Sequence, residues 1–114
     1  GLAKQINRLA TSVREGTMTM EQMQGGTFTI NNTGAFGSIL SKGIINHPQA
    51  AIIQVESIVQ KPVFIEENVL AGRHIANLCI SIDHRILDGL ICGKFLQHVK
   101  FLLENFEKRQ MSVD

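Results

Sequence analysis

The feature that most constrains the fold of this chain is a change of hydrophobic period near Asp88 and Gly89. Before this point, residues 74–82 are mostly apolar, which predicts a strand that is buried on both faces. After it, apolar residues recur at helical spacing, which predicts a long amphipathic helix. The apolar stripe of that helix consists of Ile91, Phe95, Val99, Leu102 and Phe106. A buried strand joined directly to a long helix indicates a fold in which helices pack against a sheet.

The first part of the chain predicts two more helices. Apolar residues recur at helical spacing from Leu2 to about Val13, and Gly16 is suited to end that helix. Thr19 is followed by Gln22 in the pattern of a capping box, which predicts a short second helix that ends before residues 25–26.

Runs of β-branched and aromatic residues predict further strands at residues 27–30, 50–55 and 59–65. Residues 66–68 form a polar turn after the last of these strands, so we expect a hairpin or meander there. Residues 31–38 are rich in Asn and Gly and predict a tight loop after the first strand. Together these elements predict an α/β two-layer sandwich with helices on one face of a mixed sheet.

The composition argues against several classes of protein. The 114 residues carry 11 basic and 10 acidic side chains without a run of like charge, so we expect no nucleic-acid partner. No apolar run approaches the ~20 residues that cross a bilayer, and we recognise no signal-peptide pattern, so we expect no membrane partner. Cys79 and Cys92 lie singly in apolar stretches and are predicted to be buried free thiols, which favours a cytoplasmic setting. Because Gly1 opens directly onto a helical pattern, we expect a fragment that was cut or is disordered upstream.

Ionisable residues interrupt the join between the predicted strand and the long helix. These residues are Asp83, His84, Arg85 and Asp88. Burying an unpaired charge is costly, so the three charged side chains should be paired or hydrogen-bonded in the folded protein. The histidine is either a catalytic base or a structural residue, because imidazole is the side chain that ordinarily titrates near neutral pH.

Two blocks of this sequence resemble the acyltransferase component of 2-oxoacid dehydrogenase complexes. The first block is DHRILDG at residues 83–89, which ends an apolar strand and precedes a long C-terminal helix. The second block comprises GGTFTINNTG at residues 25–34 and IINHPQA at residues 44–50, in the family's order and at a similar separation. Chloramphenicol acetyltransferases share the fold and a related ending, but they have histidine where this chain has Asp83. Residues 54–59 and the Asn-rich loop are most similar to bacterial branched-chain acyltransferases.

The resemblance implies that residues 1–114 are the C-terminal half of a single acyltransferase catalytic domain with the chloramphenicol-acetyltransferase-like fold. It implies transfer of an acyl group, expected to be branched, between dihydrolipoamide and coenzyme A. In this scheme His84 is the general base that removes the proton from the attacking thiol, and the thiolate adds directly to the thioester without an acyl-enzyme. Asp88 either contacts the imidazole or anchors the loop through an arginine. We favour the anchoring role, because a carboxylate also suits a helix N-terminus.

The oxyanion donor is where this sequence departs from the family pattern. The family has Ser or Thr at the position that matches Asn31, although a side-chain amide is also a hydrogen-bond donor. The alternative is a turn-forming Asn31, with Thr29 or Thr33 as the donor. Because the family's loop lies along coenzyme A, Asn31 and Asn32 are the predicted cofactor-binding residues.

The other ionisable residues give no second site. His47, His74 and His98 are expected to be surface or satisfied histidines rather than catalysts. No histidines fall four residues apart, and none pairs with Cys or a carboxylate at a metal-like spacing, so no metal is predicted.

The resemblance also implies partners. Family members form homotrimers, with the histidine and the oxyanion donor from neighbouring subunits across a channel, and the trimers assemble into a cage. A lipoyl domain outside this chain would present the lipoyl group, and the dehydrogenase and dihydrolipoamide dehydrogenase components would complete the complex. Two rivals remain: a non-catalytic structural core subunit, which the departure at Asn31 favours and the intact His84 opposes, and a stand-alone chloramphenicol-acetyltransferase-like enzyme. The acyl group itself is not fixed by sequence, because one methylene is worth only ~1–3 kcal/mol of discrimination.

Overall fold

The computed structural model describes residues 1–107, which divide into two compact units. One unit spans Phe28–His98 and contains the sheet and the first part of the last helix. The other comprises residues 1–27 together with residues 99–107.

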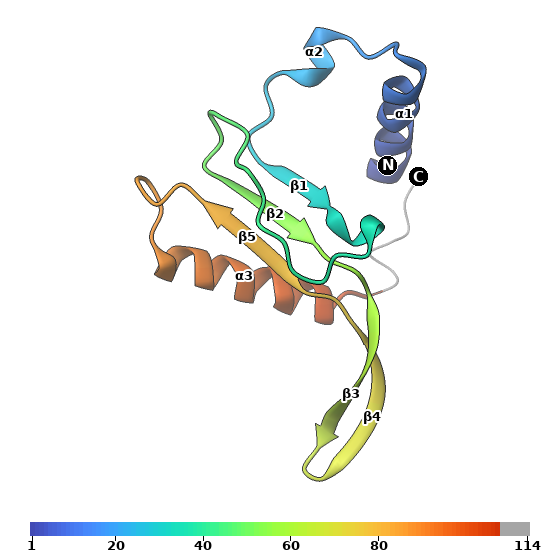
Figure 1. The fold of residues 1–114 in the computed structure, drawn as a ribbon, viewed down its shortest axis with the longest axis vertical. Helices are drawn as coiled ribbons and strands as arrows, with labels where there is room; N and C mark the ends of the chain where they lie inside the picture. The colour runs from blue at the N-terminus through green and yellow to red at the C-terminus, as the bar shows by residue number, and fades with distance from the viewer. Residues whose placement is uncertain (108–114) are drawn as a thin grey trace. The chain divides into compact units, whose positions relative to one another are not determined.

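The sheet of the Phe28–His98 unit has three strands in the order β1-β2-β5 (Figure 1). They are β1 (Thr29–Asn32), β2 (Ala51–Val55) and β5 (Leu78–Ile82). Strand β2 lies in the centre, parallel to β1 and antiparallel to β5, which confirms the predicted mixed sheet. The first three residues of β2 are the most buried apolar stretch of this unit, because both edges of β2 are paired.

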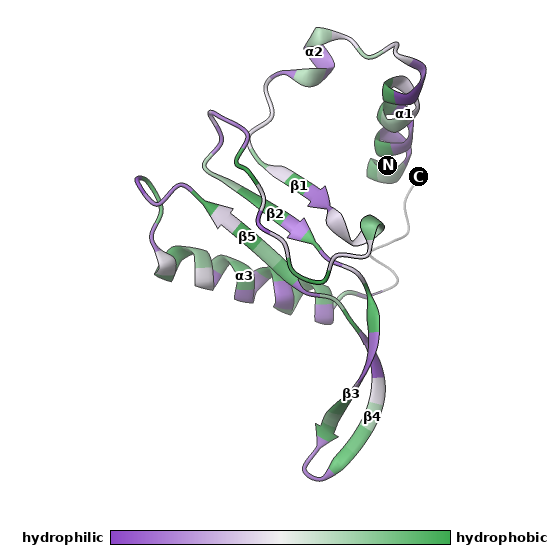
Figure 2. Ribbon diagram, in the orientation of Figure 1, coloured by the Kyte–Doolittle hydropathy of each residue, from purple (hydrophilic) through white to green (hydrophobic). Residues whose placement is uncertain are grey.

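Strand β1 differs from the prediction in its bounds. It begins and ends two residues later than the expected 27–30, so Asn31 and Asn32 belong to the strand instead of the following loop. The reason is that β1 stays paired with β2 as far as the register Asn32↔Val55. Figure 2 shows the resulting polar end of β1, which lies beside the end of β2.

The long helix α3 (Gly89–Glu104) follows β5 after a short turn (Figure 1). Asp88 begins the helix, because its side-chain oxygen accepts a hydrogen bond from the Ile91 amide at 2.8 Å. The Phe28 and Phe95 rings lie 5.7 Å apart, which fixes this helix against the chain that enters β1. The predicted helix is confirmed, although it ends before Phe106.

Strands β3 (Val59–Glu66) and β4 (Val69–Ile75) form a separate antiparallel hairpin, which confirms the predicted one. Asn68 turns the chain at its tip with a left-handed φ of 61°. The single strand expected at residues 74–82 is wrong. Residues up to Ile75 belong to β4 and pair with β3, whereas residues from Leu78 belong to β5 and pair with β2. The chain therefore changes its pairing partner between Ile75 and Leu78. Asn77 occupies the break, and its side-chain amide donates to the Ile39 carbonyl at 2.8 Å.

The other unit contains α1 (Leu2–Glu15) and α2 (Met20–Met23), and both predicted helices are confirmed. Gly16 ends α1 with a left-handed φ of 68°, as expected of a C-terminal glycine. Thr19 and Gln22 form the predicted capping box at the start of α2.

The thiols are both free, but only one matches its predicted burial. Cys92 on α3 is buried, whereas Cys79 on β5 is half-buried. Cys79 is more open than expected because β5 is an edge strand of the three-stranded sheet.

The loop after β1 is pinned to the end of β2. It begins with the short 3-10 helix η1 (Thr33–Phe36). The Ser57 amide donates to the Ser38 carbonyl at 2.8 Å, and the Ser57 hydroxyl donates to the Gly34 carbonyl at 2.9 Å. Gly34 lies so close to the backbone that follows β2 that a Cβ on Gly34 would be 2.5 Å from the Glu56 carbonyl carbon.

We therefore expect Gly34→Ala to destabilise the protein by ~1–3 kcal/mol, because the clashing atoms are backbone and cannot rotate away. Gly93→Ala on α3 is the matched control, since a Cβ there meets nothing within 4 Å. That variant should keep or raise stability by up to ~1 kcal/mol, as Ala does in a helix. Urea unfolding of the natural protein that carries this sequence measures both. A Gly34→Ala protein as stable as the parent would contradict the close approach.

Candidate active site

His84 lies in the turn between β5 and α3, which we call the histidine turn (residues 83–88). The Asp83 amide donates to the Ala50 carbonyl at 2.8 Å, which ties the start of the turn to the chain that enters β2. The Asp83 carbonyl accepts from the Ile86 and Leu87 amides at 3.1 and 3.0 Å. The turn is therefore held by its backbone, and the His84 side chain is exposed.

The two charged neighbours of His84 bind each other. The Arg85 guanidinium donates to both Asp83 carboxylate oxygens, at 2.9 Å through Nε and 2.8 Å through Nη2. The Arg85 amide also donates to Asp83 Oδ1 at 3.0 Å. These hydrogen bonds from Arg85 lower the pKa of the Asp83 carboxyl to about 2, and Asp83 raises the pKa of Arg85 in turn. The predicted pairing of Asp83 and Arg85 is confirmed.

Asp88 caps α3 and makes no hydrogen bond with His84 within the described residues. The arrangement agrees with an anchoring role. The partner of Asp88 here is the Ile91 amide, and the arginine of the anchoring role is expected upstream of this chain.

The second candidate group is the polar end of β1, formed by Asn31 and Asn32. The Asn32 side-chain oxygen accepts from the Ala35 amide at 3.2 Å and so begins the 3-10 helix. The Asn31 side chain is exposed, and no hydrogen bond to it is found in the described part of the chain. Its amide is therefore available as a donor.

The alternative donors Thr29 and Thr33 are already engaged. The Thr29 hydroxyl donates to Gln49 Oε1 at 2.5 Å, and the Thr33 hydroxyl donates to Glu56 Oε2 at 2.8 Å. A hydroxyl carries a single hydrogen, so neither threonine has a second one to offer. Of the three residues that the sequence left open, only Asn31 has no side-chain hydrogen bond within the described residues.

Glu56 is a buried carboxylate that sequence analysis did not single out. Its side chain is only 2% exposed, and it accepts hydrogen bonds from Ser41 at 2.5 Å and from Thr33 at 2.8 Å. Burial alone would raise the pKa of this carboxyl. The hydrogen bonds from Ser41 and Thr33, with smaller contributions from two neighbouring side chains, outweigh burial and hold the pKa below its usual value of 4.5. One signal was present in the sequence, since Glu56 directly ends an apolar strand beside a serine.

The two candidate groups lie at opposite ends of the sheet. Ile82, just before the histidine turn, pairs with Ala51 at the start of β2, whereas Asn31 pairs with Gln54 near its end. The strand rise of ~3.3 Å per residue separates these two levels by ~10 Å, and His84 lies two residues further away. One copy of the chain therefore does not bring His84 and Asn31 to the same substrate atom.

The remaining histidines are exposed, as predicted. His74 lies on the β3–β4 hairpin and His98 on α3, while His47 lies in the loop before β2 and makes a small contribution to the lowered pKa of Asp83. Within residues 1–107 no cluster of three His, Cys, Asp or Glu side chains is arranged to hold a metal ion. In the same residues, no helix has the length and apolar character that a membrane span requires.

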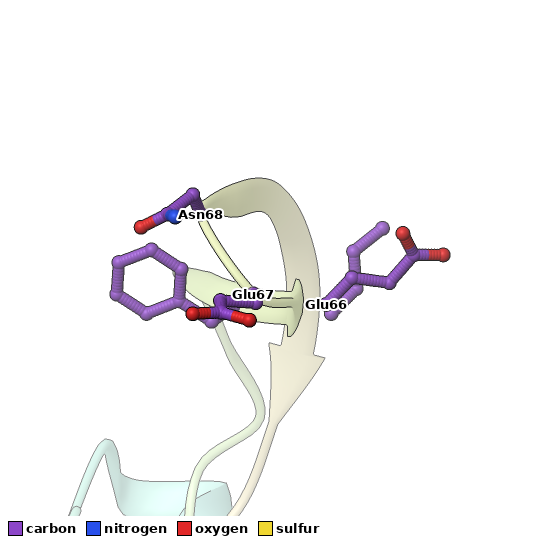
Figure 3. A pocket seen from close by; sticks show the side chains of 5 residues that line it. Glu66, Glu67 and Asn68 are labelled. Atoms are coloured by element: carbon purple, nitrogen blue, oxygen red, sulfur yellow. The ribbon is translucent and has the colours of Figure 1, made fainter.

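Figure 3 shows an open hollow at the tip of the β3–β4 hairpin, lined by residues 64–68. It contains two carboxylates, Glu66 and Glu67, and the Asn68 amide, with an aromatic and an aliphatic side chain. These residues belong to the hairpin and include neither His84 nor Asn31. The candidate site residues His84 and Asn31 instead lie in the histidine turn and at the end of β1, where their side chains are exposed.

The lowered pKa of Glu56 predicts a pH dependence of stability. Because the folded-state pKa lies below 4.5, the carboxylate stabilises the fold fully above that pH and loses its contribution as the pH falls further. Glu56→Gln should therefore be less stable than the parent at pH 7, and the gap should narrow as the pH falls from 4.5 to 3. Urea midpoints measured across this range test this, with Glu104→Gln on the exposed face of α3 as the control. A gap of constant size would show that the charge of Glu56 contributes nothing.

Comparisons with known proteins agree with the geometry. The model of the 2-oxoacid dehydrogenases acyltransferase family (catalytic domain) matches residues 1–111. The chain is 58% identical over 109 residues to the lipoamide acyltransferase component of the branched-chain alpha-keto acid dehydrogenase complex of Bacillus subtilis, covering 96% of this chain and 26% of that protein. The chain thus spans about a quarter of the length of the curated relatives it matches.

Two solved structures share the fold. A probable dihydrolipoamide acetyltransferase from Listeria monocytogenes superposes with a TM-score of 0.91 at 57% identity, covering 95% of this chain and 46% of that one. Azotobacter vinelandii dihydrolipoamide acetyltransferase superposes with a TM-score of 0.86 at 31% identity, covering 91% and 42%. The Azotobacter structure comes from an investigation of the role of a serine, a histidine and an asparagine in the catalytic mechanism of that enzyme. The sequence match and the shared fold show that this chain belongs to the 2-oxoacid dehydrogenase acyltransferase family, within the catalytic domain.

Proposed function

We propose that the protein containing this chain transfers an acyl group between a dihydrolipoyl thiol and coenzyme A. The observation that carries the proposal is the placement of His84, which is exposed in a backbone-fixed turn at the end of a half-buried strand in an acyltransferase family member. Thiol-to-thiol acyl transfer needs a base that ionises the attacking thiol and a donor for the oxyanion. His84 and Asn31 supply these two groups.

In the proposed reaction, the neutral His84 imidazole takes the proton of the attacking thiol. The thiolate then adds to the thioester carbonyl of the other substrate, and the negative charge moves to the carbonyl oxygen. When the carbon–sulfur bond of the departing thiol breaks, the imidazolium returns its proton to that sulfur. Two thiols exchange one acyl group, and no residue of the protein is acylated.

The oxyanion donor in this scheme is the side-chain amide of Asn31. Its position on the strand is fixed by the register with Gln54, and the competing hydroxyls of Thr29 and Thr33 point to other acceptors. A fixed donor of this kind is typically worth ~10²–10³ in rate. Asn31 and Asn32 would also contact coenzyme A, which lies along this strand end in the proposal.

The separation of His84 and Asn31 supports an active site shared between two copies. With the base and the donor at opposite ends of one sheet, a thioester can meet both only where the turn of one copy faces the strand end of another. From the resemblance to the family we propose a homotrimer, in which each of three equivalent interfaces forms one such shared site. Assembly of trimers into a cage is part of the same proposal, and one relative is described as the cubic core of the pyruvate dehydrogenase multienzyme complex.

The substrates and partners follow from the similarity to the Bacillus subtilis protein, which is described as a component of the branched-chain alpha-keto acid dehydrogenase complex. We propose a branched acyl group, a lipoyl domain as the carrier of the dihydrolipoyl thiol, and dehydrogenase and dihydrolipoamide dehydrogenase components as partners. Cys79 and Cys92 are unpaired thiols, which fits the cytoplasm as the proposed compartment.

In the natural protein, His84→Ala should lower kcat at least ~100-fold, because removing a general base typically costs ~10²–10⁴ in rate. His98→Ala, an exposed histidine of α3, is the matched control and should keep parental activity. Steady-state transfer from isobutyryl-, isovaleryl-, acetyl- and succinyl-coenzyme A to dihydrolipoamide measures both variants, and the branched donors should have the highest kcat/KM. If the His84 variant keeps parental activity, His84 is not the base. If the parent is inactive with every donor, the chain is a structural core subunit.

His84→Ala and Asn31→Ala homomers should each be nearly inactive, whereas co-expression in equal amounts should restore activity. With random mixing, about a quarter of the sites would combine an intact His84 from one copy with an intact Asn31 from the next. Activity of the mixed oligomers, purified through different tags on the two variants, is the measurement. No recovery in mixed oligomers would place both groups in one copy, and full activity of Asn31→Ala alone would remove Asn31 as the donor.

A further inference from the structure

We propose that Asp83 and Arg85 act as a clamp that positions the His84 imidazole for proton transfer. The proposal rests on the proposed function of His84 as the base. The clamp is the pair of side chains on either side of His84, joined to each other across it. Neither residue is proposed to touch substrate, so both are positioning residues.

The clamp closes a small ring around a single residue. Asp83 and Arg85 are two positions apart, and their side chains meet through both guanidinium contacts at 2.9 and 2.8 Å. Asp83 Oδ1 also accepts the Arg85 amide at 3.0 Å, so one carboxylate holds the backbone and the side chain of Arg85 together. The backbone torsions of His84, which lies inside this ring, cannot change without breaking these contacts.

The Asp83 side of the clamp is attached to the sheet. The Asp83 amide donates to the Ala50 carbonyl at the entry to β2, and Asp83 directly follows β5. The Asp83 side chain is 21% exposed, whereas that of Arg85 is 85% exposed. Asp83 is therefore the fixed member, and Arg85 folds back onto it from solvent.

Stability alone does not account for this geometry. An exposed ion pair typically contributes only ~0–1 kcal/mol to folding. Within the described residues, Arg85 makes no side-chain hydrogen bond except to Asp83. Since the pair joins no two separate elements, its effect is confined to the turn that carries His84.

The clamp also stays closed over the range in which imidazole titrates. The hydrogen bonds from Arg85 keep the pKa of Asp83 at about 2, with a small contribution from His47 across the turn. The charges of the clamp are therefore constant while a histidine exchanges its proton near neutral pH. A geometry that does not change with the protonation of the base suits a group that must accept and return a proton in one cycle.

The test compares four variants of the natural protein in the acyl-transfer assay. Arg85→Ala opens the clamp, and Arg85→Lys keeps the charge but removes the two-pronged contact. Asp83→Asn keeps an acceptor for the Arg85 amide and removes the charge. Lys100→Ala is the matched control, because it removes another exposed ion pair, the one with Glu104 on α3.

We expect kcat of Arg85→Ala to fall at least ~10-fold with KM changed less than ~2-fold, since misplacing a catalytic group by about 1 Å can cost ~100-fold in rate. Arg85→Lys should be nearly as slow as Arg85→Ala, because a charge alone does not close the ring. Melting temperature and oligomeric size should match the parent in all four variants. Hydrogen–deuterium exchange of residues 84–87 should increase in the Arg85 and Asp83 variants and stay parental in Lys100→Ala.

Three outcomes would overturn the clamp. The first is parental kcat in Arg85→Ala, and the second is full rescue by Arg85→Lys, which would reduce the effect to charge. The third is a loss of kcat that merely follows a loss of folded protein. His84→Ala, measured in parallel, separates this failure from failure of the proposed function. An inactive His84 variant beside a fully active Arg85→Ala rejects the clamp alone, whereas a fully active His84 variant rejects the function on which the clamp rests.

Discussion

The structure depends on the pairing of β2 with one parallel and one antiparallel neighbour. Because β1 runs with β2, the chain leaves β1 beside the end of β2, and because β5 runs against β2, the chain leaves β5 beside its start. The two exposed polar groups that follow these strands are thus placed at opposite ends of the same sheet. A catalytic site that needs both groups must be completed by another copy of the chain.

The two ends of the sheet are made rigid by different means. At the end of β1, the buried carboxylate of Glu56 binds two hydroxyls of the following loop, and Gly34 allows that loop to touch the β2 backbone. At the end of β5, the turn is held by backbone hydrogen bonds and by the exposed pair of Asp83 and Arg85. A buried hydrogen-bond network holds the loop next to the proposed donor Asn31. In the proposal, an exposed ion pair orients the proposed base His84.

Sequence periodicity predicted the helices, the hairpin and the mixed sheet, because each depends on local patterns of apolar residues and caps. It failed where strands exchange partners, as at Asn77, since a continuous apolar run does not reveal that one half pairs with β3 and the other with β2. It also left the donor open among Thr29, Asn31 and Thr33. Comparing these three residues needs the positions of Gln49 and Glu56, which are distant in sequence and accept hydrogen bonds from the Thr29 and Thr33 hydroxyls.

In the proposed oligomer, one active site takes its base from one copy and its oxyanion donor from another. The most direct measurement is an experimental structure of the natural protein with an acyl-coenzyme A bound. The His84 ring and the Asn31 amide nearest to one thioester should belong to different copies, with Asn31 Nδ2 within hydrogen-bond distance of the thioester oxygen. If both groups beside that thioester came from the same chain, or if His84 lay far from every bound thioester, the shared active site would be contradicted.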